Sequence, residues 1–81
     1  MTELSSVAFV LIMCDSKFVI DILKKCDEID IVTEIIHVDG PWKILLKLES
    51  SLMDKIRDVV RWKLRKMEGI ESTLTLVQHM T

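Results

Sequence analysis

The sequence contains little of what usually reinforces a small domain. Its 81 residues include only two cysteines, Cys14 and Cys26, which form no C-x-x-C pair and are too few for a disulfide framework. Both lie within apolar runs, so we expect buried, reduced thiols in a cytoplasmic protein. A single core of this size contributes only about 3–5 kcal/mol. Because 49% of the residues are apolar, we expect copies of the chain to associate.

An excess of positive charge is also lacking. The chain has 11 Lys and Arg against 13 Asp and Glu, a formal net charge of −2, whereas a nucleic-acid surface gathers its basic side chains into a patch. The densest basic stretch, from Arg57 to Lys66, alternates with apolar residues at helical spacing and is typical of a solvated helix face. The sequence therefore predicts no direct contact with nucleic acid.

No apolar run reaches the roughly 18–20 residues that a membrane-spanning helix needs. The longest run, residues 7–14, has neither the preceding basic segment nor the following cleavage site of a secretory signal. The chain also contains no linker or low-complexity stretch. We therefore expect residues 1–81 to form one cytoplasmic domain with no attachment to a membrane.

What is present is a regular alternation of strand and helix patterns. Residues 7–14 are β-branched, aromatic and apolar without a break, which predicts a strand that is apolar on both faces. Asp15 or Ser16 is expected to cap a helix whose apolar positions follow a helical spacing: Val19, Ile22, Leu23 and Cys26. Residues 31–38 and 42–49 alternate on either side of Asp39-Gly40-Pro41, which predicts a β-hairpin.

A longer helix is expected to begin at the capping box Ser51-x-x-Asp54 and to end with Gly69 in the C′ position. Its apolar face is predicted to contain Leu52, Met53, Ile56, Val59, Val60, Leu64 and Met67. A last strand follows at residues 70–80. The order β-α-β-β-α-β with right-handed crossovers predicts an α+β, ferredoxin-like fold, in which a four-stranded antiparallel sheet carries both helices on one face.

The other face of that sheet is expected to lack cover. It includes apolar side chains of the first strand such as Phe9 and Leu11, and an exposed apolar patch of this kind marks an interaction surface. We therefore expect a two-fold dimer through this face. Trp62 lies roughly 120° from the centre of its helix's apolar face, which is typical either of an interface anchor or of a rim residue that packs on Arg65 or Lys66.

Three segments of this pattern resemble the effector-binding domain of the Lrp/AsnC family of regulators, also called the RAM domain. Residues 7–12, Val-Ala-Phe-Val-Leu-Ile, are similar to the family's opening strand, Ala-Tyr/Phe-Val-Leu-Ile. Residues 38–44, Val-Asp-Gly-Pro-Trp-Lys-Ile, lie where the family has Val-Thr-Gly-x-Tyr-Asp-Ile/Leu. Residues 69–76, Gly-Ile-Glu-Ser-Thr-Leu-Thr-Leu, follow its Gly-Val-x-x-Thr-x-Thr pattern. The resemblance covers nearly the whole chain.

The resemblance implies dimers that pair through the sheet face, rings of dimers, and small effectors, often amino acids, bound in the clefts between dimers. Because the first strand begins within about six residues of Met1, we expect a stand-alone domain that has no helix-turn-helix domain. Such a domain is expected to modulate transcription regulators, including full-length members of the family with which it forms mixed oligomers. The alternative is a ligand-free, ferredoxin-like protein-interaction module.

The hairpin turn and two threonines are the candidate ligand site. Gly40 lets a ligand approach the backbone closely, and Thr73 and Thr75, two apart on one strand, offer two aligned hydroxyls. The alternative is that Gly40 only forms the turn while the threonines favour the strand. The predicted ligand-binding residues are Val38, Asp39, Gly40, Pro41, Trp42, Lys43, Thr73 and Thr75.

Lys43 departs from the family pattern. It stands where the family has Asp, whose carboxylate suits a ligand ammonium group, and a lysine repels an ammonium but attracts a carboxylate or another anion. Asp39, where the family usually has Thr, restores a negative charge nearby. We therefore expect an effector other than an ordinary α-amino acid bound in the usual pose.

The sequence offers no catalytic, metal or cofactor motif. His37 and His79 have no ligand spacing with each other or with the cysteines, and a Cys-His dyad would need a positioned base and an oxyanion hole. A small enzyme similar in outline to acylphosphatases needs an arginine in the first loop, where Asp15-Ser16-Lys17 has only a lysine. We therefore expect a protein that is not an enzyme.

Overall fold

The computed structural model describes residues 5–78. The strands are β1 (Ser6–Cys14), β2 (Val32–His37), β3 (Ile44–Ser50) and β4 (Ile70–Gln78). The helices are α1 (Val19–Asp27), preceded by the 3₁₀ turn η1 (Ser16–Phe18), and α2 (Met53–Asp58), continued by the π-helical segment η2 (Val59–Leu64). The predicted β-α-β-β-α-β order is confirmed. His79 and Met80, which the sequence placed in the last strand, lie outside the described residues.

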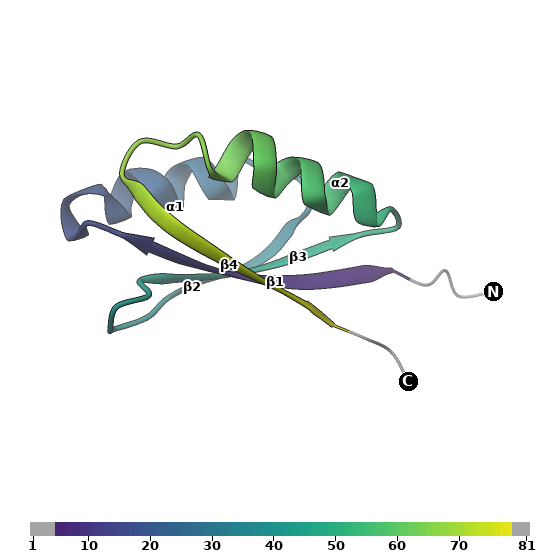
Figure 1. Cartoon of the computed structure of the whole chain (residues 1–81), viewed down its shortest axis with the longest axis horizontal. Coiled ribbons are helices and arrows are strands. Elements are labelled where there is room, and N and C mark those ends of the chain that lie inside the picture. Colours follow the sequence, from purple (N-terminus) through teal and green to yellow (C-terminus); the bar gives the residue numbers. More distant parts are fainter. Residues whose placement is uncertain (1–4, 79–81) are drawn as a thin grey trace.

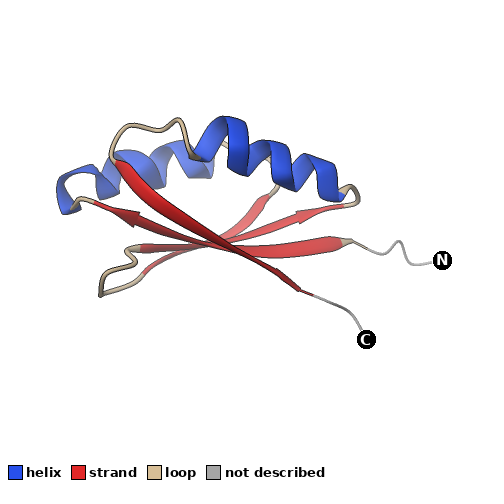
Figure 2. Ribbon diagram, in the orientation of Figure 1, coloured by secondary structure: helices blue, strands red, loops and turns tan. Residues whose placement is uncertain are grey.

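The four strands form one antiparallel sheet in the order β2-β3-β1-β4. Both helices lie on the same face of the sheet, and β1 and β4 cross in the middle of the view (Figure 1; Figure 2). The sheet twists strongly in the same view, as strands of L-residues do. This is the predicted ferredoxin-like arrangement, with two layers and one sheet face free of helices.

The core lies between the helices and the sheet. Alternate residues of β1, namely Ala8, Val10 and Ile12, are fully buried, and β3 contributes every second residue on the same face. The two helices supply the other side of the core with Val19, Ile22, Cys26, Ile56, Val59, Val60 and Leu64. The predicted burial of both cysteines as free thiols is confirmed.

The second helix differs from its prediction at both ends. Leu52 is its N-cap residue and no side chain caps it, so the capping box Ser51-x-x-Asp54 was wrong. Instead the Ser50 hydroxyl oxygen accepts a hydrogen bond from the Leu52 N–H (3.2 Å). Leu52 itself is exposed. The helix ends at Leu64 rather than just before Gly69, because the chain turns at Met67, whose N–H donates to the Leu64 carbonyl (3.1 Å).

Two glycines have positive φ, Gly40 in the hairpin turn (φ 140°) and Gly69 just before β4 (φ 92°). Their surroundings differ. No heavy atom lies within 4 Å of the position that a Gly40 Cβ would occupy, whereas a Cβ on Gly69 would collide with the Phe18 side chain. Gly69 therefore has two reasons to be glycine, its backbone conformation and the ring packed against it.

Cys26 makes the stability of the fold depend on pH in the alkaline range. Burial raises the pKa of its thiol from 9.0 to about 11. Above pH 9 the unfolded chain loses a proton that the folded chain keeps, so the stability present below that pH is lost as the pH rises towards 11. We expect this thiol to reduce the free energy of unfolding by about 2–3 kcal/mol across that range, measured by urea unfolding at several pH values.

The variant Cys26→Ala is the control for this prediction. It is expected to be less stable than the original chain at neutral pH, because it leaves a cavity. Its free energy of unfolding should nevertheless fall less steeply above pH 9, since no thiol titrates at that position. The same pH dependence in both proteins would contradict the assignment to Cys26.

Candidate functional site

The hairpin turn between β2 and β3 is anchored to the sheet at its base. The Val38 N–H donates to the Lys43 carbonyl (2.8 Å), and the Lys43 N–H donates to the Ile12 carbonyl of β1 (2.9 Å). Beyond this base, Asp39 and Pro41 are exposed, while Val38, Trp42 and Lys43 are half-buried. The space beside Gly40 is open. The turn thus presents backbone groups and one tryptophan on a fixed support.

Charges of both signs lie near the end of β1 beside this turn. The pKa of the Cys14 thiol is raised, first by burial and then by the negative charge of Glu71, while the positive charge of Lys43 lowers it. Lys43 of the hairpin and Glu71 of β4 therefore act on the same thiol from two sides. This end of the sheet therefore brings charges of both signs, Lys43, Glu71 and Asp15, near one thiol.

One chain does not bring the two predicted threonines to the hairpin. Thr73 lies opposite Ile12 on β1, and Ile12 lies opposite Ile44, the first residue of β3 after the turn. Thr73 therefore lies two strand spacings from Ile44, a distance of roughly 10 Å. Thr75 lies two residues further along β4, opposite Val10. A ligand that contacts both the hairpin and the threonines would need them from different subunits, and their joint role stays a prediction.

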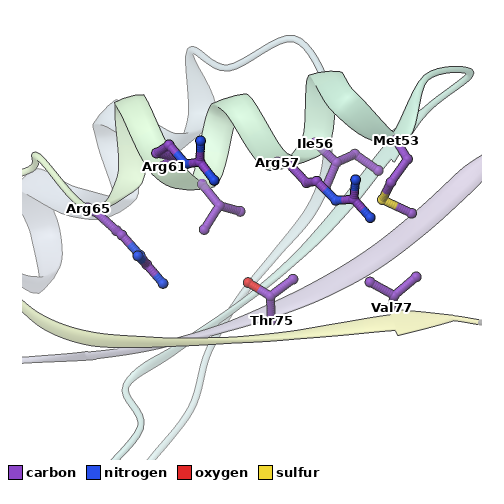
Figure 3. Close-up of a pocket in the computed structure, with 8 residues that line it drawn as sticks. Met53, Ile56, Arg57, Arg61, Arg65, Thr75 and Val77 are labelled. Carbon is purple, nitrogen blue, oxygen red and sulfur yellow. The ribbon is translucent and has the colours of Figure 1, made fainter.

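A cleft between the second helix and β4 was missed by the sequence reasoning. It has a volume of about 290 Å³, and Figure 3 shows side chains of the helix opposite Thr75 and Val77 of β4. Its lining consists of Met53, Ile56, Arg57, Val60, Arg61, Arg65, Thr75 and Val77. The one hint in the sequence was the four-residue spacing of the three arginines, Arg57, Arg61 and Arg65, which the lysines of the same stretch do not follow.

The sheet face without helices, here called the open face, is largely apolar. Leu11 of β1 lies opposite Leu45 of β3 and Leu74 of β4, and Ile36 of β2 lies opposite Leu45. These four side chains form one row across all four strands. The next row contains Phe9 and Leu76, together with the opposite charges of Glu34 and Lys47. The open face is an apolar band with a charged border.

Trp62 lies off the core side of the second helix, as its position in the helix predicts, and is 56% exposed. The ammonium nitrogen of Lys66 lies 4.8 Å from the centroid of its ring, within the range of a cation–π interaction. The packing on a neighbouring basic side chain is therefore present. A role for Trp62 as an interface anchor stays a prediction.

Two further observations concern the described part of the chain. Within residues 5–78 no helix is long and apolar enough to cross a membrane. In the same range no three His, Cys, Asp or Glu side chains come together in a way that could hold a metal ion. His79 lies outside these residues.

The family model of the Lrp/AsnC ligand binding domain matches residues 7–79. An uncharacterized HTH-type transcriptional regulator of Pyrococcus furiosus is 32% identical to the chain over an alignment of 82 positions, which covers 98% of this chain and 55% of the regulator. The chain thus spans about half the length of the curated relatives it matches.

Two solved structures agree with this match. A protein of Thermus thermophilus has a TM-score of 0.87 at 28% identity, over 94% of this chain and 95% of that one. AsnC of E. coli has a TM-score of 0.84 at 27% identity, over 94% of this chain and 52% of AsnC. The resemblance indicated by the opening strand, the hairpin and the start of β4 is confirmed, and the chain belongs to the Lrp/AsnC ligand binding domain family.

Proposed function

We propose that this chain forms dimers through its open face, binds an amino acid or a related small metabolite between subunits, and thereby modulates transcription regulators. A regulatory, effector-binding role follows from the family. The proposal includes no catalytic step, metal or cofactor, and it places the protein in the cytoplasm without direct contact to nucleic acid or membrane.

The observation that carries the proposal is the apolar row across the open face. Leu74 and Ile36 are each 44% exposed in the single chain, and they form the two ends of this continuous apolar row, on the edge strands β4 and β2. Burial of such side chains against a second copy contributes about 25 cal/mol for each Å² of apolar surface. A two-fold axis through the face also lets Glu34 and Lys47 of one copy meet opposite charges of the other. Rings of such dimers would place hairpin turns next to neighbouring subunits.

The hairpin provides the chemistry for an effector in this proposal. Its free backbone groups and Trp42 suit a small polar molecule with an apolar side, and Lys43 favours a carboxylate. Thr73 and Thr75 of a neighbouring subunit would complete the site with two hydroxyls. The same surfaces allow mixed oligomers with full-length regulators of the family, because these regulators contain a domain of the same fold.

Calorimetric titration tests the ligand. We expect succinate and glutamate to bind more tightly than leucine, since Lys43 attracts a carboxylate and repels an ammonium group. The variant Lys43→Asp restores the family's carboxylate and is expected to reverse this order of affinities. Leucine should then bind about tenfold more tightly than succinate, in line with one charge-assisted hydrogen bond. Tight binding of leucine to the original chain would contradict the prediction.

The control is Lys24→Asp, an exposed charge reversal on α1 that should leave the order of ligands unchanged. Static light scattering in the same samples gives the oligomer mass. A change of mass with ligand supports effector-linked assembly. The absence of any ligand effect, together with capture of a specific protein partner, would favour the ligand-free interaction module instead.

A further inference from the structure

We propose that the cleft between the second helix and β4 is a second ligand site, one that binds a small organic anion with an apolar portion. This site differs from the hairpin part of the proposed effector site and shares only Thr75 with the residues proposed there. All of its lining residues come from one chain, so it does not depend on the dimer. Four features carry the inference.

The first feature is an area of β4 that the helix layer leaves uncovered. Thr75 and Val77 lie opposite Val10 and Ala8, whose side chains are completely buried beneath the helices. On the same side of the sheet, however, Thr75 is exposed and Val77 is 41% exposed. The helices therefore do not extend across the edge strand, and a hollow remains beside it.

The second feature is the apolar wall of this hollow. Ile56 and Val60 belong to the core but border the cleft, and Met53 and Val77 close it at one end. In Figure 3 Met53 and Ile56 extend from the helix and Val77 extends from β4 on the facing side of the cleft. A hydrocarbon or aromatic group would find apolar contact on two sides here.

The third feature is a row of arginines of the second helix along the cleft. Arg57, Arg61 and Arg65 all line the cleft. In a regular α-helix each step of four residues drifts by about 40° around the axis, so three such side chains would spread away from one another. The turn of η2 is wider, because the Arg65 N–H donates to the Val60 carbonyl five residues earlier (3.1 Å). In this wider turn, four residues rotate by less than 360° around the helix axis. This rotation offsets the excess rotation of the α-helical step from Arg57 to Arg61.

The π-helical segment therefore keeps Arg61 and Arg65 on the same side as Arg57. Figure 3 shows Arg57 and Arg65 extending from the helix towards β4, with Arg61 between them. Segments of this type are rare and occur frequently at functional sites. A single feature of the backbone thus explains why three guanidinium groups gather at one hollow.

The fourth feature is that these cations have little to neutralise them. Arg57 forms an ion pair with Asp54 at 3.7 Å, and both side chains are largely exposed. Over residues 5–78, neither Arg61 nor Arg65 has a carboxylate within ion-pairing distance. Glu71 borders a neighbouring hollow that also contains Arg65, but it does not line the cleft. Three like charges in a row favour an anion, and guanidinium groups bind carboxylates and phosphates in a bidentate manner.

The size of the cleft limits the ligand to a small molecule, since ligand pockets usually measure about 300–1,000 Å³. We therefore use hexanoate and hexyl phosphate as probes of the two anionic head groups, acetate as the head group alone, and hexylamine as the cation of similar length. Amide chemical shifts in two-dimensional NMR are expected to change at residues 56–65 and 75–77 with hexanoate or hexyl phosphate. A stronger response to one of them distinguishes carboxylate from phosphate recognition.

The double variant Arg61→Gln/Arg65→Gln is expected to weaken hexanoate or hexyl phosphate binding at least about tenfold. Lys63→Gln removes an exposed cation of the same segment that does not line the cleft, and it should leave the affinity unchanged. Equal weakening in both variants, equal affinity for hexylamine or acetate, or shifts confined to the hairpin would each overturn the proposal.

The measurement is repeated with the variant Leu74→Glu, whose substitution lies on the open face. Because the cleft belongs to a single chain, the affinity for the anionic probe should persist within about twofold whether or not this variant forms dimers. Failure of the proposed dimer thus remains distinguishable from failure of the cleft. Loss of probe binding in Leu74→Glu, with the fold intact by NMR, would contradict a site within one chain.

Discussion

Replacing Gly69 by alanine is expected to lower the free energy of unfolding by about 2–5 kcal/mol, the sum of two costs. The first is the left-handed backbone at φ 92°, which a Cβ disfavours. The second is steric. The new Cβ would lie 2.6 Å from the Cβ of Phe18, and nearer still to the ring. Rotation of the ring does not relieve the contact with Phe18 Cβ, so the backbone of η1 or of the turn must shift.

Gly40→Ala is the matched control. It imposes a similar backbone cost at φ 140° but meets no neighbouring atom within 4 Å, so we expect a loss of only about 1–2 kcal/mol. Urea unfolding at one protein concentration, followed by the fluorescence of the two tryptophans, measures both. Equal losses in the two variants would show that Phe18 exerts no steric constraint on Gly69.

The second large effect is expected from Leu74→Glu. In the proposed dimer this side chain, at the β4 end of the apolar row of the open face, is buried against the second copy, where a carboxylate loses its hydration without gaining a partner. We expect the dissociation constant of the dimer to rise at least about 100-fold, which corresponds to roughly 3 kcal/mol. Light scattering should then give the mass of one chain, 9.4 kDa, at concentrations where the original chain gives twice that value.

Ile20→Glu controls for the added charge. Ile20 lies on α1, in the helix layer, and is 61% exposed, so this substitution places the same carboxylate away from the open face. The mass of that variant should match the original chain. A dimeric Leu74→Glu, or an original chain that is monomeric at micromolar concentration, would rule out pairing through the open face.

The sheet could be predicted from the sequence because its signals are local. The unbroken apolar run of residues 7–14 indicates a strand that is apolar on both faces, and this strand, β1, lies inside the sheet between β3 and β4. Asp39-Gly40-Pro41 marks the reversal between two alternating segments. The three matched segments then led to the family. Each of these conclusions depends on residue types at fixed spacing, which the sequence displays directly.

The cleft could not be predicted in the same way. A regular spacing of 100° per residue assigns Arg57, Arg61 and Arg65 to a general solvated face along with the lysines. The wider turn of η2 depends on how Val59, Val60 and Leu64 are all accommodated in the core. The exposed side of β4 depends on where the helices lie over the sheet. Both are results of tertiary packing and have no counterpart in local periodicity.

The position of β1 has a consequence for how the protein is made. One edge of this most apolar strand pairs with β3, but its other edge pairs with β4, the fourth strand to leave the ribosome. Until then its backbone N–H and C=O groups along that edge have no partner, and such an edge invites association with other nascent chains. The sheet is completed only by this contact between distant parts of the chain, which is the slow kind of step in folding.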